Sequence, residues 1–160
     1  MFKDYPQPLT WMKKGLIFEP DGSKQWAQSH AMCPTPLVIS DEIIRVVYAA
    51  LDENSIGRIG YIDVAAKDPL KIIFDCSDPI LDIGTPGHFD DNGVVPISAI
   101  KKDGKIFLYY AGFQLATKVR YFIFSGLAVG STDNQKFNRY SNVPILDRSQ
   151  EGVLLRSAPC

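Results

Sequence analysis

Five side chains in this sequence could give or take a proton, and all lie beside expected turns or strand starts. Asp90 and Asp91 stand together before an Asn-Gly pair, Glu151 precedes a glycine, and His30 and His88 each precede an expected strand. Carboxyl and imidazole groups are the usual general acids and bases. Each residue also has a structural interpretation, because an Asp pair before Asn-Gly opens turns, Glu before Gly is typical of solvated loops, and histidines often fill hydrogen-bonding roles. Neither histidine has a metal-ligand spacing.

A second group of residues could bind a ligand without reacting with it. Trp26 is flanked by polar residues, so its indole is a candidate for stacking on an apolar ligand face. Asp52 and Asn54 precede Arg58 closely enough to form a turn with a local ion pair. Alternatively, Arg58 could donate hydrogen bonds to a hydroxyl, carboxylate or phosphate group of a ligand.

Several other chemistries lack their local motifs. The sequence has no G-x-G-x-x-G, G-x-x-x-x-G-K-[ST], G-x-S-x-G or H-E-x-x-H pattern, which disfavours dinucleotide, phosphate-loop, α/β-hydrolase and zincin sites. Cys33, Cys76 and Cys160 form no C-x-x-C pair, and we expect reduced thiols that pack as small apolar side chains. We expect no metal and no cofactor.

Composition describes one globular domain. The chain has 160 residues, of which 46% are apolar and 22% charged, with a formal net charge of -1. Its basic residues are scattered, so we expect no nucleic acid partner. No window approaches the ~20 apolar residues of a membrane span, and the first thirty residues lack a signal-peptide core, so we expect a cytoplasmic protein.

The elements that must position these residues are short strands. Apolar runs are rich in Val, Ile, Tyr and Phe, are bounded by Gly, Pro, Asp or Asn, and are joined by hairpin-length turns, which predicts antiparallel meanders and no helix. The expected strands are 31–34, 36–39, 43–51, 58–64, 71–74, 94–100, 105–112, 121–129 and 136–140.

The strand pattern repeats with a period near 63 residues. Pro79-Ile80-Leu81-Asp82 recurs 65 residues later as Pro144-Ile145-Leu146-Asp147, and Val47-Tyr48-Ala49 corresponds to Tyr109-Tyr110-Ala111 at an offset of 62. Pro36, Pro96 and Pro159 are spaced 60 and 63 residues apart, and we expect each to open an inner strand. Four short strands per repeat are what a propeller blade needs, and a plain β-sandwich is the alternative.

With these landmarks, the sequence resembles the five-bladed propellers of glycoside hydrolases, the broad group that contains families 43, 32 and 130. The stretches that carry the resemblance are Ser29 to Pro36, Arg58 to Ile62, Gly87 to Pro96 and Leu108 to Gly112. It implies an all-β partial propeller of about two and a half blades, related to uncharacterised members that belong with polysaccharide biosynthesis. The boundaries it implies are 1–28 as a leading segment, 29–86 as blade 1, 87–150 as blade 2 and 151–160 as the start of blade 3.

The resemblance also implies a sugar pocket at one end of the propeller axis. The loops that lead into the first strand of each blade and those that join the second strand to the third would face it. Implied catalytic residues are Asp90, Asp91 and Glu151, and implied substrate-binding residues are Trp26, His30, Asp52, Asn54, Arg58, His88, Gln114 and Arg120. The sequence departs from families 43 and 32 in one respect, because the triplets ending at Pro36, Pro96 and Pro159 contain no carboxylate.

The function implied is action on a glycosidic bond of a sugar or sugar conjugate. The missing acids leave open a carbohydrate-binding or degenerate propeller without turnover, and a truncated product without independent activity. Five blades would need roughly 300 residues, so we expect an open propeller whose uncovered sheet would pair with a second copy or with a missing C-terminal half.

Overall fold

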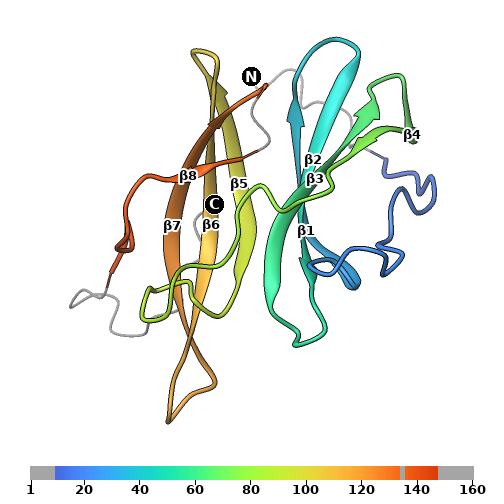
Figure 1. The fold of residues 1–160 in the computed structure, drawn as a ribbon. Coiled ribbons are helices and arrows are strands. Elements are labelled where there is room, and N and C mark those ends of the chain that lie inside the picture. The colour runs from blue at the N-terminus through green and yellow to red at the C-terminus, as the bar shows by residue number, and fades with distance from the viewer. Residues whose placement is uncertain (1–9, 134–135, 148–160) are drawn as a thin grey trace, which may run out of the picture.

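The computed structural model describes residues 10–133 and 136–147, which contain eight strands and no helix. The strands form two four-stranded antiparallel sheets, each in chain order (Figure 1). The first sheet comprises β1 (Ser29–Val38), β2 (Ile43–Leu51), β3 (Gly57–Ala65) and β4 (Asp68–Asp75). The second comprises β5 (Val94–Lys102), β6 (Lys105–Leu115), β7 (Tyr121–Ser131) and β8 (Asn138–Arg139). The predicted all-β meander is therefore confirmed.

The turns follow from local sequence. Lys102 pairs with Lys105 across a two-residue loop, in which Asp103 and Gly104 both have positive φ, at 51° and 73°. Two such residues form the turn whose twist matches that of a hairpin, and Asp-Gly is a preferred pair for it. In the first sheet, the Asp52 side chain accepts hydrogen bonds from the N–H groups of Asn54 and Ile56 and so closes the β2–β3 turn.

Strand β1 differs from the prediction of two separate strands. It is one strand with register shifts between Ser29 and Met32 and between Met32 and Thr35, and with Cys33 at a φ of 50°. Proline cannot donate to a sheet, but at an edge strand or a bulge its missing N–H costs little. Pro34 lies within the second register shift and Pro36 pairs in regular register on this edge strand, so neither proline ends the strand. Strand β8 is also shorter than predicted and keeps only two residues.

The repeat has a structural counterpart. Tyr48 pairs with Gly60 in the first sheet and Tyr110 with Gly126 in the second, and the isolated bridges Ile59–Leu81 and Ser125–Leu146 lie at matching places. The prediction that Pro36 and Pro96 are equivalent was wrong. Pro36 pairs with Val46, whereas Pro96 pairs with Tyr110, the counterpart of Tyr48. The bulge in β1 shifts its register, which spacing alone does not reveal.

The core runs through both sheets and the interface between them. Strand β5 packs against β1, β2 and β3, and in Figure 1 it lies on the side of its sheet that faces β1. Ile106, Leu108 and Tyr110 of β6 are fully buried. Within the first sheet, Nε of Arg45 on β2 donates to the Asp63 carboxylate of β3 at 2.8 Å, and NH1 of Arg45 reaches the second sheet, where it donates to the Thr132 carbonyl oxygen at 3.2 Å.

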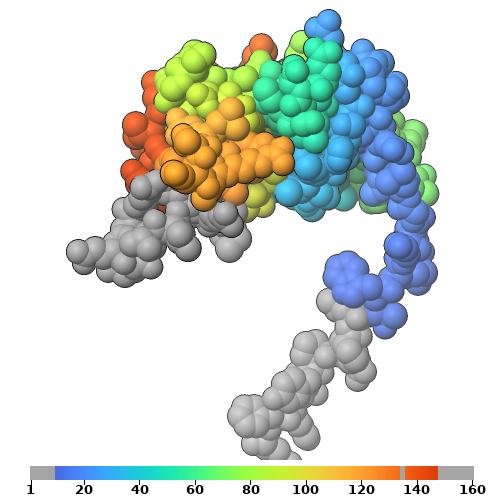
Figure 2. All heavy atoms as spheres, turned by 90° about the horizontal axis from the view of Figure 1, so that it is seen from below, coloured from blue at the N-terminus to red at the C-terminus, as the bar shows by residue number. Residues whose placement is uncertain are grey.

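The first described residues lie apart from the sheets. Residues 10–14 are exposed and extend from the body as an arm, drawn in blue in Figure 2, and Leu16 and Ile17 border a hollow that Val46 and Ile62 of the first sheet also line. The arm joins the sheet at Phe18, whose ring centroid lies 5.0 Å from that of Tyr48. In residues 10–133 and 136–147 no helix has the length and apolar character required to cross a membrane.

Candidate functional site

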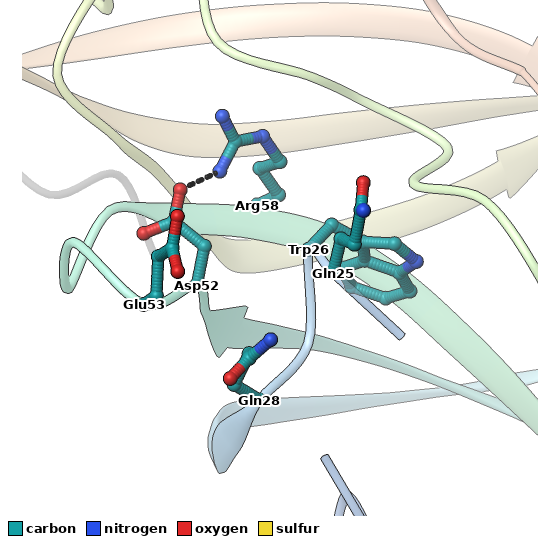
Figure 3. Close-up of a pocket in the computed structure, with 6 residues that line it drawn as sticks. All are labelled: Gln25, Trp26, Gln28, Asp52, Glu53 and Arg58. Atoms are coloured by element: carbon teal, nitrogen blue, oxygen red, sulfur yellow. Dashed lines mark hydrogen bonds and ion pairs between the residues drawn. The ribbon is translucent and has the colours of Figure 1, made fainter. Parts of the chain in front are cut away.

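A pocket of about 460 Å³ opens at one end of the first sheet (Figure 3). Its lining residues come from the loop that leads into β1, from the β2–β3 turn and from the start of β3, and they are Gln25, Trp26, Gln28, Asp52, Glu53 and Arg58. The two loops meet because Leu51 pairs with both Ser29 and Gly57, so β1 begins where β2 turns into β3. The fold therefore brings together Trp26, Asp52 and Arg58, three of the predicted site residues.

Trp26 is rigidly held at the back of this pocket. Its side chain is 8% exposed, its indole N–H donates to the Ser77 carbonyl oxygen at 2.8 Å, and its ring stacks on Tyr48 with centroids 6.2 Å apart. A Cβ on Gly60 would lie 2.2 Å from the indole, so only glycine leaves room for the ring in this position. One face of the indole is thus occupied by protein, and its remaining edge borders the pocket.

Arg58 is fixed between two carboxylates. Its NH1 donates to Asp52 Oδ2 at 2.6 Å and its Nε to Asp82 Oδ1 at 2.7 Å. Burial by itself would lower the pKa of Arg58, but the hydrogen bonds and charges of Asp52 and Asp82 outweigh it and raise that pKa. Burial would likewise raise the pKa of Asp52, but bonds from the Ile56 N–H, Arg58 and the Asn54 N–H hold it below its usual range.

The polar contacts continue from the pocket into the interface between the sheets. Arg139 of β8 donates from NH2 to the Asp82 carbonyl oxygen and from Nε to Asp90 Oδ2 at 2.8 Å. Asp90 is fully buried, and its Oδ2 also accepts from the Tyr110 hydroxyl at 2.9 Å. Burial, followed by the charge of Asp90, raises the pKa of Tyr110. We call this chain of contacts, Asp52–Arg58–Asp82–Arg139–Asp90–Tyr110, the interface network.

A second set of predicted residues lies together in the loop before β5. Asp91 Oδ2 accepts from the Gly87 N–H at 2.8 Å, and His88 Nε2 lies 3.2 Å from the Thr85 hydroxyl. Gln114 Nε2 donates to the His88 carbonyl oxygen at 3.3 Å, linking this loop to the end of β6. These residues adjoin the first sheet, because the Val94 carbonyl oxygen lies only 3.2 Å from where a Cβ would stand on Gly57.

The remaining predicted residues lie outside the pocket. His30 is exposed, with Nδ1 2.9 Å from the Ser29 hydroxyl, and Asn54 is exposed in its turn. Arg120 lies over the Tyr121 ring at 5.2 Å. Glu151 falls outside the residues that the structure describes. The catalytic and substrate-binding roles of the predicted residues stay predictions.

Some residues of the site were not predicted. Gln25, Gln28 and Glu53 line the pocket, and all three neighbour predicted residues in the sequence. Asp82 belongs to the repeated Pro-Ile-Leu-Asp motif, which could have marked it. No sequence signal indicates Arg139. Within residues 10–133 and 136–147, no group of three His, Cys, Asp or Glu side chains is placed to hold a metal ion.

Comparisons with known proteins found two curated proteins of similar sequence and solved structures of similar fold. No family model matches the chain. Two uncharacterized proteins of Mycobacterium tuberculosis, MT1551 of strain CDC 1551 and Rv1502 of strain H37Rv, are each 34% identical over 151 residues. The match covers 94% of this chain and 50% of theirs, so the chain spans about half the length of these curated relatives.

The solved structures agree on the fold. A glycosyl hydrolase from Bacteroides ovatus aligns with a TM-score of 0.64 and 16% identity, over 85% of this chain and 40% of its own. A second Bacteroides ovatus structure, from strain ATCC 8483, gives a TM-score of 0.61 at 19% identity over the same shares. At these identities the likeness concerns the fold alone, and it confirms the predicted fold class, an all-β partial propeller built of four-stranded meanders.

Proposed function

We propose that this protein is carbohydrate-active and holds a sugar or sugar conjugate in the pocket beside Trp26. The observation that carries the proposal is the lining of that pocket: two amides, two carboxylates, one guanidinium and an indole edge around about 460 Å³. Convergent donors and acceptors beside an aromatic ring are the mixture that fixes a polyol, and the volume lies in the range of small-molecule sites.

Two side chains of the pocket are held in place by other residues, which favours a binding site over a surface hollow without function. Arg58 is held by Asp52 and Asp82, so its remaining N–H groups are oriented before a ligand arrives. Trp26 is likewise fixed by Ser77 and Tyr48. Preorganised groups lose little conformational freedom on binding. Less of the binding free energy is therefore spent on ordering side chains, a cost that can cancel weak polar contacts.

Action on a glycosidic bond is the second candidate function, favoured by the fold shared with a glycosyl hydrolase of Bacteroides ovatus. Such hydrolysis needs two carboxyl groups on opposite sides of the bond. Glu53 is the exposed carboxylate of the pocket, whereas Asp52 is engaged with Arg58 and Asp90 is fully buried against Arg139. We therefore propose binding as the activity of the described residues, and hydrolysis as an activity that requires a further acid, for which Asp91 and Glu151 stay candidates.

Binding can be tested by saturation-transfer NMR and calorimetry with a panel of monosaccharides and short oligosaccharides. We expect Gln28→Ala and Glu53→Ala to weaken binding about fivefold or more, since each removes a polar contact worth about 1 kcal/mol. Glu42→Ala is the matched control, because Glu42 is also exposed in a turn of the first sheet but at the opposite end. Binding that survives both pocket substitutions would place the sugar elsewhere, and no binding by any sugar would refute the proposal.

Turnover requires a separate assay. Release of reducing ends from oligosaccharides by the wild-type chain would support hydrolysis, and its loss in Asp91→Asn with binding retained would assign that carboxylate. Wild-type protein that binds sugars without releasing any product would leave the binding function and remove the hydrolytic one.

A further inference from the structure

The charges around the pocket are unbalanced. The lining holds two carboxylates, those of Asp52 and Glu53, and one guanidinium, that of Arg58, which also pairs with the Asp82 carboxylate beside the pocket. Figure 3 shows Asp52 and Glu53 at the β2–β3 turn, with Arg58 reaching toward Asp52. The positive charge of Arg58 is already matched by two short ion pairs at 2.6 and 2.7 Å. The wall of the pocket therefore carries a net negative charge.

Arg58 presents hydrogen-bond donors without a free positive charge. An anionic ligand would have to compete for the guanidinium with the carboxylates of Asp52 and Asp82, which already accept hydrogen bonds from it. It would also approach the Glu53 carboxylate, which is exposed. Two other cationic side chains are already paired, since Lys24 contacts Asp75 at 2.6 Å and Arg139, beside Asp82, contacts Asp90 at 2.8 Å.

We infer that the pocket selects its sugar by charge, taking an amino sugar in its protonated form in preference to the neutral sugar and excluding sugar acids and sugar phosphates. The inference rests on the proposed function, which it makes more specific. The ammonium group of the ligand lies beside Glu53 and Asp52, while ring hydroxyls meet Gln28 and the free N–H groups of Arg58. A unit charge about 4 Å from a carboxylate in water is worth roughly 1 kcal/mol, so the preference should be roughly fivefold.

The test compares ligands that differ only in charge. Affinities of glucosamine, glucose, N-acetylglucosamine, glucuronate and glucose 6-phosphate, and of the corresponding galactose series, are measured by calorimetry at about pH 6, where amines are protonated and carboxylates ionised. We expect the amine to bind roughly fivefold more tightly than the neutral sugar of the same series and the two anions to bind most weakly. Added salt should reduce these differences by screening.

Two variants identify the source of the selectivity. Glu53→Gln keeps the shape of the side chain and removes its charge, so the ratio between amine and neutral sugar should fall toward one. Glu42→Gln makes the same chemical change at the far end of the sheet and should leave the ratio unchanged. Equal or tighter binding of the anions, or a ratio that Glu53→Gln does not alter, overturns the inference alone. Absence of binding by every member of both series overturns the proposed function and the inference with it.

Discussion

Asp52 has two tasks at the residue scale, and its two carboxylate oxygens divide them. Oδ1 accepts from the N–H groups of Asn54 and Ile56 and shapes the turn, while Oδ2 holds Arg58. The turn and the pocket are therefore set by one ionised group. Protonating or replacing that group should disturb both, which makes Asp52 the residue at which stability and binding are coupled.

Asp52→Asn should lower stability in a pH-dependent way. The folded-state pKa of Asp52 is lowered, so its stabilisation is present above the unfolded value of about 4 and is lost as the pH falls through the folded value. At pH 7 we expect the variant to lose about 1–2 kcal/mol of unfolding free energy, as for hydrogen bonds to a charged group. The difference should begin to shrink as the pH falls below about 4, and the two proteins should converge once the pH is below the lowered folded-state pKa of Asp52.

Urea unfolding at several pH values measures this difference. Asp41→Asn is a suitable control, because Asp41 is exposed in the turn between β1 and β2 at the opposite end of the sheet. An Asp52→Asn variant that is as stable as wild type at pH 7, or a deficit that stays constant down to pH 3, would contradict the role of the ionised carboxylate.

Residue spacing located part of the pocket and missed the rest for a physical reason. Asp52 and Arg58 lie six residues apart, so a turn brings them together and sequence reasoning can find the pair. Trp26 was found from its polar neighbours. The contacts of Arg139 with Asp82 and Asp90 join residues 57 and 49 positions apart and depend on how one sheet packs on the other. No local pattern encodes that packing.

At the scale of elements, the interface network ties β8 to the loop after β4. Arg139 is the residue that joins the two, because it contacts Asp82 on one side and the buried Asp90 on the other. Asp90 Oδ1 has no hydrogen-bond partner among the described residues, so the ion pair with Arg139 and the Tyr110 hydroxyl compensate the burial of this charge.

Arg139→Met should destabilise the protein by about 3–5 kcal/mol, since it leaves the Asp90 charge buried without its cation. The double variant Asp90→Asn with Arg139→Met should be more stable than the single variant, because the uncompensated charge is then removed. Thermal unfolding followed by circular dichroism measures both. A single variant within about 1 kcal/mol of wild type would show that the pair contributes little to the interface.

Strands were predicted best where clear turn residues bound an apolar run on both sides. The predicted bounds of β2, residues 43–51, agree with the structure because apolar residues fill the strand and turn residues end it on both sides. β1 was predicted as two pieces because prolines normally interrupt strands, and neither the register shift around Pro34 nor the edge position of the strand, which tolerates Pro36, is visible in a list of residue types. β8 was predicted too long because its pairing with β7 covers only Asn138 and Arg139.

At the scale of the whole molecule, β4 is a sheet edge on which no further strand pairs among the described residues. All eight of its residues are exposed, and Leu70, Ile72, Ile73 and Phe74 are 53, 39, 50 and 36% exposed. β4 is the last strand in the order of its sheet (Figure 1). An exposed apolar edge is a template for pairing with another chain, and proteins commonly protect such edges with lysine, proline and acidic residues. Here Asp68, Pro69 and Lys71 are in that position.

Lys71→Ile should therefore promote self-association rather than unfolding. The substitution joins Leu70 to Ile72 in one uninterrupted apolar run at an unpaired edge, which is the pattern that favours intermolecular strand pairing. Static light scattering and thioflavin fluorescence at rising protein concentration measure the effect, with circular dichroism as the check on folding. Lys105→Ile is the matched control, since Lys105 is also an exposed strand residue but lies on β6, which has partners on both sides. Equal association of the two variants would indicate that added hydrophobic surface, and not the open edge of β4, drives the process.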